Sequence, residues 1–153
     1  MLKTELKFSP NAIGLIWSEL NKEAKLWSIS EPALEKLFQK IILDQKSFKA
    51  GLMEVIASEL SADDKDYSLI HKAASEAFNN DPFLEEAAAA DLCATLERDP
   101  ACHSYLKPFL FYKGYQAIQA YRLANWLWHE ERKVLAEFVQ GRASKVFQVD
   151  IHP

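Results

Sequence analysis

The sequence predicts an all-α fold that ends in a short strand-like tail. Apolar residues recur at intervals of three and four along most of the chain, and helix-start signals stand between these stretches. Such intervals place side chains on one face of an α-helix. Strict alternation of apolar and polar residues, which is typical of a strand, occurs only at the end, from Gln148 to Pro153. We therefore expect helices up to about residue 147 and the first residues of a strand after it.

Helix-start signals divide the chain into seven predicted helices. Ser9 and Asp81 each precede a proline, so a side-chain oxygen can accept from the free N–H groups of the first turn. The proline then occupies the first helical position, where its missing N–H costs nothing. Ser61 is another start signal, because Asp63 and Asp64 follow it and acidic residues are favoured at the positive end of a helix dipole. The predicted ranges are 10–28, 31–44, 46–60, 63–79, 82–97, 113–130 and 132–146.

The predicted helix at 113–130 is apolar around most of its circumference. Tyrosine, leucine, alanine and two tryptophans follow one another in GYQAIQAYRLANWLW, so no single polar face remains. A helix of this kind is buried on more than one side. Two interpretations stay open: it is the central helix of this domain, surrounded by the others, or one of its sides meets another subunit.

Length and composition indicate one globular domain and exclude several classes of protein. The 153 residues are 49% hydrophobic and 26% charged, which is ordinary for a globular chain. The net charge of −4 argues against a nucleic-acid surface, and no apolar run is long enough to cross a membrane. With four glycines, the chain has no glycine-rich phosphate loop. Charged residues within the first eight positions are not typical of a signal peptide.

The number of cysteines indicates the redox state of the compartment in which the chain is found. Cys93 and Cys102 are the only ones, and in a chain without a signal sequence they indicate reduced thiols in the cytoplasm. His103 lies directly beside Cys102, which is not the spacing of zinc ligands. We therefore expect no metal site.

Taken alone, the residue pattern offers few catalytic candidates. His71, His103 and His129 have no evident partner in the sequence, so each is interpreted as a surface or core-edge residue. Asp99 precedes Pro100, as Asp81 precedes its proline, and is either another helix cap or a ligand-binding carboxylate. Composition and spacing do not decide between these two roles.

Three segments resemble one enzyme family. They are RDPAC at 98–102, PFLFYKGYQAIQAYRLANWLW at 108–128 and RKVLAEFVQGRASKVFQVDIHP at 132–153. Together they resemble the N-terminal helical region of serine O-acetyltransferases, whose pattern is R-D-P-A, then K-G-aromatic-x-A-x-Q-x-Tyr-R, a tryptophan pair, and finally V-D-I-H-P. All of these stand in the family order and at the family spacing.

The resemblance implies a two-domain enzyme of which this chain holds the first part. In the family, D-I-H-P is the entry into a left-handed β-helix built of hexapeptide repeats. The helical domain is thus expected at 1–147 and the start of the β-helix at 148–153. The rest of the β-helix, with the catalytic histidine and the acetyl-CoA cleft, is expected beyond residue 153. The chain alone is expected to bind no cofactor and to be inactive.

The resemblance also implies a reaction and two site residues. The family transfers an acetyl group from acetyl-CoA to the hydroxyl of L-serine and produces O-acetylserine, the precursor of cysteine. Asp150 is expected to orient the catalytic histidine, which lies beyond residue 153 and is not His152. Asp99 is expected to help hold the substrate serine, through a charge-assisted hydrogen bond to its ammonium group.

The partners implied by the resemblance are of three kinds. L-cysteine is expected to compete with serine as a feedback inhibitor. The helical domains are expected to join two β-helix trimers into a hexamer, and a C-terminal tail outside these residues is expected to dock into O-acetylserine sulfhydrylase. No nucleic acid and no membrane is expected as a partner.

A second interpretation belongs to another class of protein. The chain could be a non-catalytic helical assembly or regulatory module that holds subunits together, and the apolar helix at 113–130 fits that role. The gene beyond the codon for Pro153 discriminates the two. Hexapeptide repeats there would establish the enzyme, whereas a stop codon would favour the module.

Overall fold

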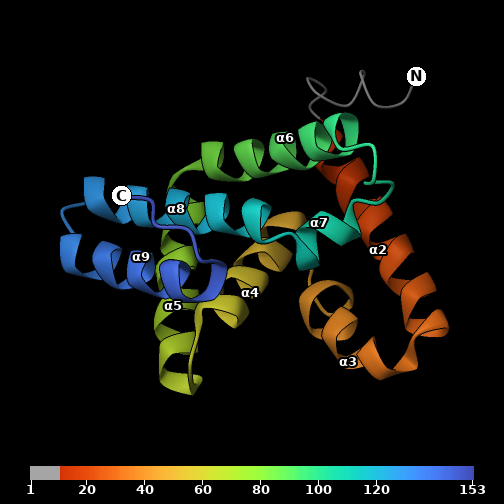
Figure 1. Ribbon diagram of the computed structural model, residues 1–153, viewed down its shortest axis with the longest axis horizontal. Helices are drawn as coiled ribbons and strands as arrows, with labels where there is room; N and C mark the ends of the chain where they lie inside the picture. Colours follow the sequence, from red (N-terminus) through yellow and green to blue (C-terminus); the bar gives the residue numbers. More distant parts are fainter. Residues whose placement is uncertain (1–10) are drawn as a thin grey trace.

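The computed structural model describes residues 11–153, and in this range every regular element is a helix. The prediction of an all-α fold is confirmed. The predicted helix start at Ser9 lies outside the described residues. The elements are α2 (Ala12–Ser30), η2 (Pro32–Leu34), α3 (Glu35–Phe38), η3 (Gln39–Leu43), α4 (Phe48–Leu60), α5 (Asp64–Asn80), α6 (Pro82–Arg98), α7 (Leu106–Phe111), α8 (Lys113–His129) and α9 (Lys133–Phe147) (Figure 1).

Side-chain caps mark the starts of α5 and α6. The predicted cap of α6, Asp81, is confirmed, whereas the start signal predicted at Ser61 is wrong, because Ser61 is the C-cap of α4 and Asp63 is the N-cap of α5. Asp63 Oδ1 accepts from the backbone N–H of Asp66 at 2.8 Å, at the start of α5. Asp81 Oδ1 accepts from the backbone N–H of Phe83 at 3.0 Å, and Pro82 occupies the first position of α6. These acceptors satisfy N–H groups that have no partner within their own helix. They therefore determine where α5 and α6 begin.

The predicted helix at 31–44 consists of three different helical conformations. It begins as the 3₁₀ turn η2, continues as the short α3 and ends as the π-helix η3. In the π-helix, the backbone N–H of Asp44 donates to the carbonyl of Gln39, five residues back, at 2.9 Å. Apolar periodicity indicates a helix here but does not distinguish these three types.

One helix was not predicted at all. The segment between 98 and 112 contains α7, which has six residues. The residue at its cap position, Tyr105, offers no side-chain acceptor to the first turn. One acceptor is local, because the hydroxyl of Ser104 accepts from the backbone N–H of Lys107 at 3.1 Å. Another comes from α2, far away in the sequence, where Glu23 accepts from the backbone N–H of Leu106.

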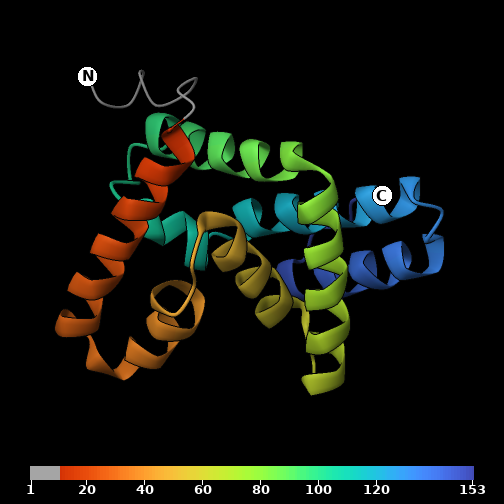
Figure 2. The same cartoon turned by 180° about the vertical axis from the view of Figure 1, so that it is seen from behind.

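Helix α8 is the central helix of the fold. It contacts α4, α5, α6, α7 and α9, and Figures 1 and 2 show α6 and α9 running alongside it while α5 crosses it. Leu123, Ala124 and Leu127 are buried on it. The central-helix interpretation of the apolar stretch is thus confirmed. Its neighbours within this chain account for most of its apolar surface.

The remaining helices pack at the two ends of α8. Helices α2 and α3 lie at one end of the molecule, and the loop between α8 and α9 lies at the other (Figure 1). Helix α4 joins the two ends, because it contacts α2 and η3 as well as α8 and α9. Phe48 and Leu52 of α4 are fully buried in this junction. None of the described helices is both long enough and apolar enough to span a bilayer.

The C-terminal tail forms no strand within residues 11–153. Helix α9 ends at Phe147 and is followed by Gln148, which has a left-handed backbone (φ 60°, ψ 32°). Val149 and Ile151 line a small pocket over α8, but Val149 is still 40% exposed, and Asp150 and His152 are exposed as well. A strand is defined by its pairing with a second strand, and the tail has no such partner in the described part of the chain.

Candidate functional site

Asp99 lies in a tight turn at the end of α6. Its backbone N–H donates to the carbonyl of Thr95 at 3.0 Å, and its own carbonyl accepts from the N–H of Cys102 at 3.0 Å. Its carboxylate oxygen Oδ1 accepts from the backbone N–H of Ala101 at 2.9 Å. No helix begins at Pro100, so the interpretation of Asp99 as a helix N-cap is wrong. The residue closes α6 and fixes the turn after it.

A pocket of about 390 Å³ opens beside Asp99, between α6 and α8. Asp91, Thr95 and Arg98 line it from α6, and Tyr115 and Ile118 are among its lining residues on α8. Nearby, partial desolvation raises the pKa of the Tyr112 phenol, and the negative charge of Asp99 raises it further. Asp99 is half-buried at this pocket. A carboxylate so placed can accept hydrogen bonds from a small cationic group.

The second carboxylate of the pocket is neutralised within the chain. Asp91 Oδ2 accepts from the guanidinium of Arg122 and from Gln119 Nε2, the latter at 3.0 Å. The guanidinium also donates to Gln119 Oε1 at 2.8 Å. Asp91 therefore balances the charge of Arg122 on α8. Sequence reasoning missed this cluster, although a glutamine and an arginine one turn apart in an apolar helix are a visible signal.

Tyr115 contributes an apolar wall to the same pocket. Its hydroxyl donates to the carbonyl of Ala88 at 3.2 Å, inside the core. Burial raises the pKa of Tyr115 well above its usual range, and the charge of Asp91 adds to the shift. The phenol therefore stays protonated at neutral pH and holds α8 against α6.

Asp150 lies apart from Asp99. Its carboxylate Oδ1 accepts from Gln140 Nε2 of α9 at 2.8 Å, and the side chain is exposed. The tail that carries it lies over Ala117, Ala120 and Ala124. These residues form a different face of α8 from the one that lines the Asp99 pocket. The structure therefore does not bring the two predicted site residues into one pocket.

The histidines also lie away from the Asp99 pocket. His103, His129 and His152 are exposed, in agreement with the interpretation of the first two as surface residues. His152 Nδ1 lies 3.0 Å from the carbonyl oxygen of Pro153, and its ring packs edge-on against Trp128 with the centroids 5.0 Å apart. Among the described residues, no histidine or cysteine lines the pocket.

Comparison with known proteins identifies the family. Residues 16–120 match the family model described as "Serine acetyltransferase, N-terminal". The chain belongs to this family. The resemblance found in the sequence motifs is thereby confirmed.

Individual members of the serine acetyltransferase family agree over nearly the whole chain. The serine acetyltransferase of Escherichia coli K12 is 36% identical over 141 residues, which cover 92% of this chain and 52% of that protein. A Vibrio cholerae serine acetyltransferase structure is 41% identical, with a TM-score of 0.88, and covers 92% of this chain and 54% of that one. A soybean structure is 39% identical, with a TM-score of 0.90, and covers 95% and 60%. The chain spans about half the length of the bacterial relatives that it matches.

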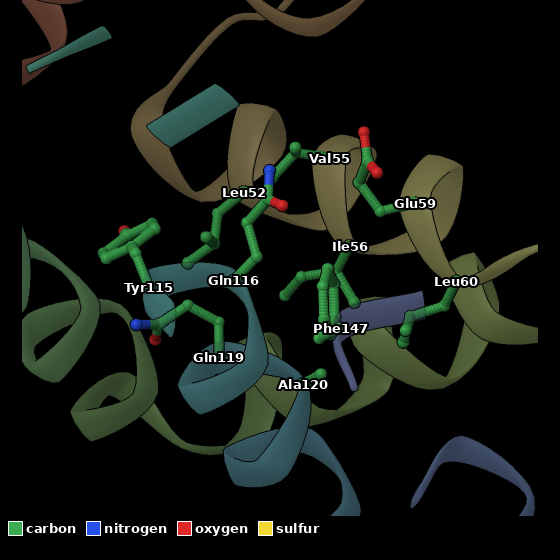
Figure 3. Close-up of a pocket in the computed structure, with 10 residues that line it drawn as sticks. All are labelled: Leu52, Val55, Ile56, Glu59, Leu60, Tyr115, Gln116, Gln119, Ala120 and Phe147. Atoms are coloured by element: carbon green, nitrogen blue, oxygen red, sulfur yellow. The ribbon is translucent and has the colours of Figure 1, made fainter. Parts of the chain in front are cut away.

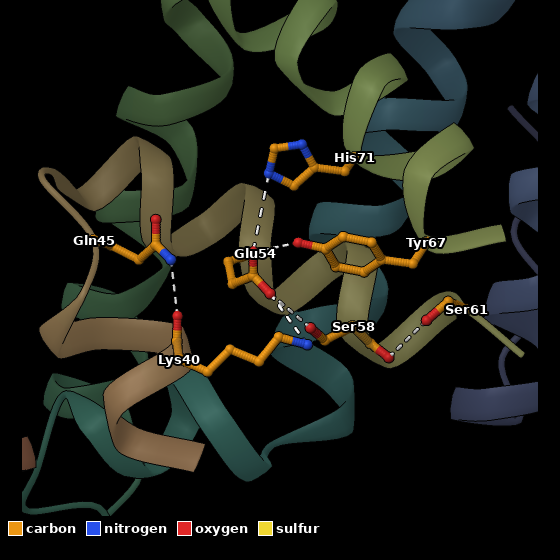
Figure 4. A network of polar contacts seen from close by, with 7 residues as sticks. All are labelled: Lys40, Gln45, Glu54, Ser58, Ser61, Tyr67 and His71. Atoms are coloured by element: carbon orange, nitrogen blue, oxygen red, sulfur yellow. Dashed lines mark hydrogen bonds and ion pairs between the residues drawn. The ribbon is translucent and has the colours of Figure 1, made fainter. Parts of the chain in front are cut away.

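A buried carboxylate outside this site is the centre of a polar cluster that sequence reasoning missed (Figure 4). Glu54 of α4 is 5% exposed. It accepts from the hydroxyl of Tyr67 at 2.6 Å and from the hydroxyl of Ser58 at 3.0 Å. Lys40 Nζ lies 3.3 Å from its Oε1, and His71 Nε2 lies 3.9 Å from its Oε2. Both carboxylate oxygens thus have partners within the chain.

The Glu54 cluster ties three elements of this serine acetyltransferase domain together. Lys40 comes from η3, Glu54 from α4 and Tyr67 from α5, and the ammonium of Lys40 lies 4.9 Å from the centre of the Tyr67 ring. A buried charge is stable only where it is paired and hydrogen-bonded. The cluster is therefore interpreted as a structural joint that anchors the π-helix.

The pocket in Figure 3 is a packed contact between α4, α8 and α9 inside the core and is not a ligand site. Leu52, Val55 and Ile56 of α4 face Gln116 of α8 and Phe147 of α9 there, and no space remains for a water molecule. Gln116 Nε2 donates to the carbonyl of Leu110 at 2.9 Å. The buried amide group of Gln116 thus has a hydrogen-bond acceptor within the core.

Side chains of the types that bind metal ions, and the two cysteines, also lie in the described part of the chain. In residues 11–153, no three histidine, cysteine, aspartate or glutamate side chains are grouped as a metal ion would require. Cys93 and Cys102 are both buried and form no disulfide. Their interpretation as reduced thiols agrees with the structure.

Proposed function

We propose that this chain is the helical part of a serine O-acetyltransferase, which transfers the acetyl group of acetyl-CoA to the hydroxyl of L-serine and makes O-acetylserine for cysteine biosynthesis. Its membership in the family supports this proposal. Similar structures, of Neisseria gonorrhoeae and soybean, are complexes with serine, and others are complexes with CoA and with cysteine. In this proposal, residues 1–147 form the helical domain and residues 148–153 begin the β-helix domain. The acetyl-CoA site is assigned to the β-helix domain.

The observation that carries the proposal is the position of Asp99. Its backbone is held by Thr95 and Cys102, and its carboxylate faces a pocket whose other carboxylate is neutralised by Arg122. A fixed carboxylate suits an ammonium group, because a charge-assisted hydrogen bond is about twice as strong as a neutral one. Asp99 thus binds the ammonium of L-serine, and L-cysteine, which has the same ammonium, competes there.

Asp150 is assigned to the general base. A serine hydroxyl is scarcely ionised at neutral pH, so its attack on a thioester needs a positioned base. In this proposal the base is a histidine beyond residue 153, and Asp150 accepts from its ring N–H and fixes its tautomer. Gln140 holds the Asp150 carboxylate at 2.8 Å in the present structure.

The Asp150 proposal is tested in the complete enzyme, meaning residues 1–153 joined to a β-helix domain. Asp150→Asn should lower turnover per folded enzyme by about 10²- to 10⁴-fold, the range that a positioned base contributes. The Michaelis constants for both substrates should change little. Circular dichroism on the same sample measures the folded fraction, and a folded variant with normal turnover would exclude Asp150 as the partner of the base.

Self-association is part of the proposal. The sequence indicated the helix at 113–130 as the contact surface, whereas the structure favours α2. Most of helix α8 is buried within the chain, although Ile118 is 42% exposed, and Leu15, Leu26 and Ile29 on α2 are more exposed still. Their spacing of eleven and three residues places them near one face of that helix. We assign to this face a contact between helical domains, as expected for a hexamer made of two trimers. Docking to O-acetylserine sulfhydrylase is assigned to a tail outside these residues, and a cytoplasmic location fits the two reduced thiols.

The role of Asp99 is tested by kinetics of the complete enzyme. Asp99→Asn should raise the Michaelis constant for serine by about 10- to 150-fold, because losing one charged contact costs about 1.5–3 kcal/mol. The Michaelis constant for acetyl-CoA should stay nearly unchanged. The matched control is Asp81→Asn, which makes the same chemical change at the cap of α6 and should leave both constants as they are. Unchanged serine kinetics in folded Asp99→Asn would refute the assignment.

A further inference from the structure

Glu23 of α2 reaches across the fold to the start of α7. Its Oε2 accepts from the hydroxyl of Ser104 at 2.6 Å and from the backbone N–H of Leu106 at 2.8 Å. Its Oε1 accepts from the backbone N–H of Tyr105 at 3.2 Å. One carboxylate thus receives three hydrogen bonds from three consecutive residues that are more than 80 positions away in the sequence.

This carboxylate adds acceptors from another helix to the one that Ser104 supplies locally. The first N–H groups of a helix have no acceptor within the helix, and Tyr105 at the cap position of α7 offers no side-chain acceptor. Glu23 provides that acceptor from outside. The Ser104 hydroxyl, held by Glu23, accepts in turn from the N–H of Lys107 at 3.1 Å. The negative charge of Glu23 also lies at the positive end of α7, where it is favoured.

The turn that carries Asp99 leads directly into this anchor. Cys102 donates its backbone N–H to the carbonyl of Asp99 at 3.0 Å and its thiol to the carbonyl of Ser104 at 3.3 Å. Cys102 is fully buried, so this link lies inside the fold. The segment 99–105 is therefore held at one end by α6, through Thr95, and at the other end by α2, through Glu23.

We propose that Glu23 is a positioning residue for the serine site: its carboxylate holds segment 99–105 against α2 and thereby keeps Asp99 facing its pocket. The inference rests on the proposed role of Asp99. Glu23 itself does not line the Asp99 pocket. It acts through the hydrogen bonds to Ser104, Tyr105 and Leu106.

Glu23→Gln is the sharpest test, because it keeps the size of the side chain and changes one acceptor oxygen into an NH₂ group. That group faces N–H donors, so at least one of the three hydrogen bonds is lost and the segment shifts. In the complete enzyme the Michaelis constant for serine should rise, by between a few-fold and about 100-fold, the latter being the cost of a 1 Å misplacement from a remote change. The constant for acetyl-CoA should not change.

The matched control is Glu19→Gln, one helical turn away on α2. Glu19 pairs with Lys22 at the surface, with 3.6 Å between the charged atoms. This variant should keep the normal constants for both substrates. Ser104→Ala is the second variant, because it removes one of the three donors while Glu23 stays. It should raise the serine constant less than Glu23→Gln does.

Amide hydrogen exchange separates positioning from general stability. In Glu23→Gln, exchange should become faster at Ala101, Tyr105 and Leu106 and stay unchanged in α8. Faster exchange throughout the protein would show a global loss of stability and would overturn the proposal. So would a normal Michaelis constant for serine in folded Glu23→Gln, provided that Asp99→Asn, measured beside it, raises that constant. If Asp99→Asn has no effect either, the proposed function itself fails, and the inference fails with it.

Discussion

Tyr67 shows how one residue makes the stability of this domain depend on pH. Burial raises the pKa of Tyr67 to about 12, and the hydrogen bond from its hydroxyl to Glu54 and the charge of Glu54 contribute further. The ordinary pKa of a tyrosine is 10.0. Between these two values the phenol keeps its proton in the folded chain and loses it in the unfolded chain. The free energy of unfolding must therefore fall as the pH rises through this window.

We expect Tyr67→Phe to make that alkaline decline less steep. One proton can contribute at most about 1.4 kcal/mol per pH unit, and solvent screening around a partly exposed ring lowers this figure. Urea denaturation of both proteins, below pH 10 and at several values between pH 10 and 12, measures the slope. Equal slopes for the two proteins would show that folding does not raise the pKa of Tyr67.

At the level of elements, Gly51 of α4 marks a close contact between helices. A methyl group at this position would lie 2.9 Å from Trp17 Cζ3 and 3.0 Å from the carbonyl oxygen of Ile41. The glycine thus lets α2 and η3 approach α4. Elsewhere the same residue type has no such role, because a methyl group at Gly141 would meet nothing within 4 Å.

The two glycines therefore predict opposite effects of the same substitution. Gly51→Ala should lower the free energy of unfolding by about 1–3 kcal/mol, the usual cost of overpacking. Gly141→Ala, in the exposed interior of α9, should raise it by up to about 1 kcal/mol, because alanine favours a helix. Denaturation by urea measures both. Stabilisation by Gly51→Ala would contradict the close packing of α2, η3 and α4.

The elements also show what the sequence can and cannot predict. Helices α5 and α6 were predicted because their start signals, Asp63 and Asp81, are local. Helix α7 was missed because it has only six residues and because Glu23, which accepts from the N–H groups of Tyr105 and Leu106, lies on another helix. Ser104 is its one local acceptor among the described residues. The N-cap interpretation of Asp99 failed for a related reason. An Asp-Pro pair starts a helix only when the residues after the proline are helical, and after Pro100 they form a turn.

The site was only partly visible in the sequence. Asp99 and Asp150 were identified through family motifs, and their roles remain proposals. The pairing of Asp91 with Arg122 could have been suspected from two polar residues in an apolar helix, but its partner on α6 could not. Contacts between side chains that are distant in the sequence depend on the packing of whole helices, which periodicity does not specify.

At the scale of the whole molecule, exposed apolar side chains remain after the helices have packed. On α2, Leu26 is 58% exposed and Ile29 is 79% exposed. Side chains of this kind on one helix face are typical of a contact surface when they are grouped. We expect the isolated chain to self-associate at micromolar concentration, as a dimer or a larger assembly, in light scattering.

A charge on the proposed contact face should weaken that association. Ile29→Glu should shift the protein towards the 17.5 kDa monomer. Val134→Glu is the matched control, because Val134 is equally exposed (81%) but lies on α9. A monomer at every concentration for the unmodified chain would rule out the contact, and an equal effect of both variants would rule out its assignment to α2.

The central claim is that this domain supplies the carboxylate that binds serine, while the catalytic base and the acetyl-CoA site lie outside it. The most direct test is the release of CoA thiol from acetyl-CoA, measured with and without L-serine, for the 153-residue chain and for the complete enzyme. We predict serine-dependent release by the complete enzyme and none above the no-protein rate by the chain alone. Serine-dependent release by the 153-residue chain would contradict the central claim.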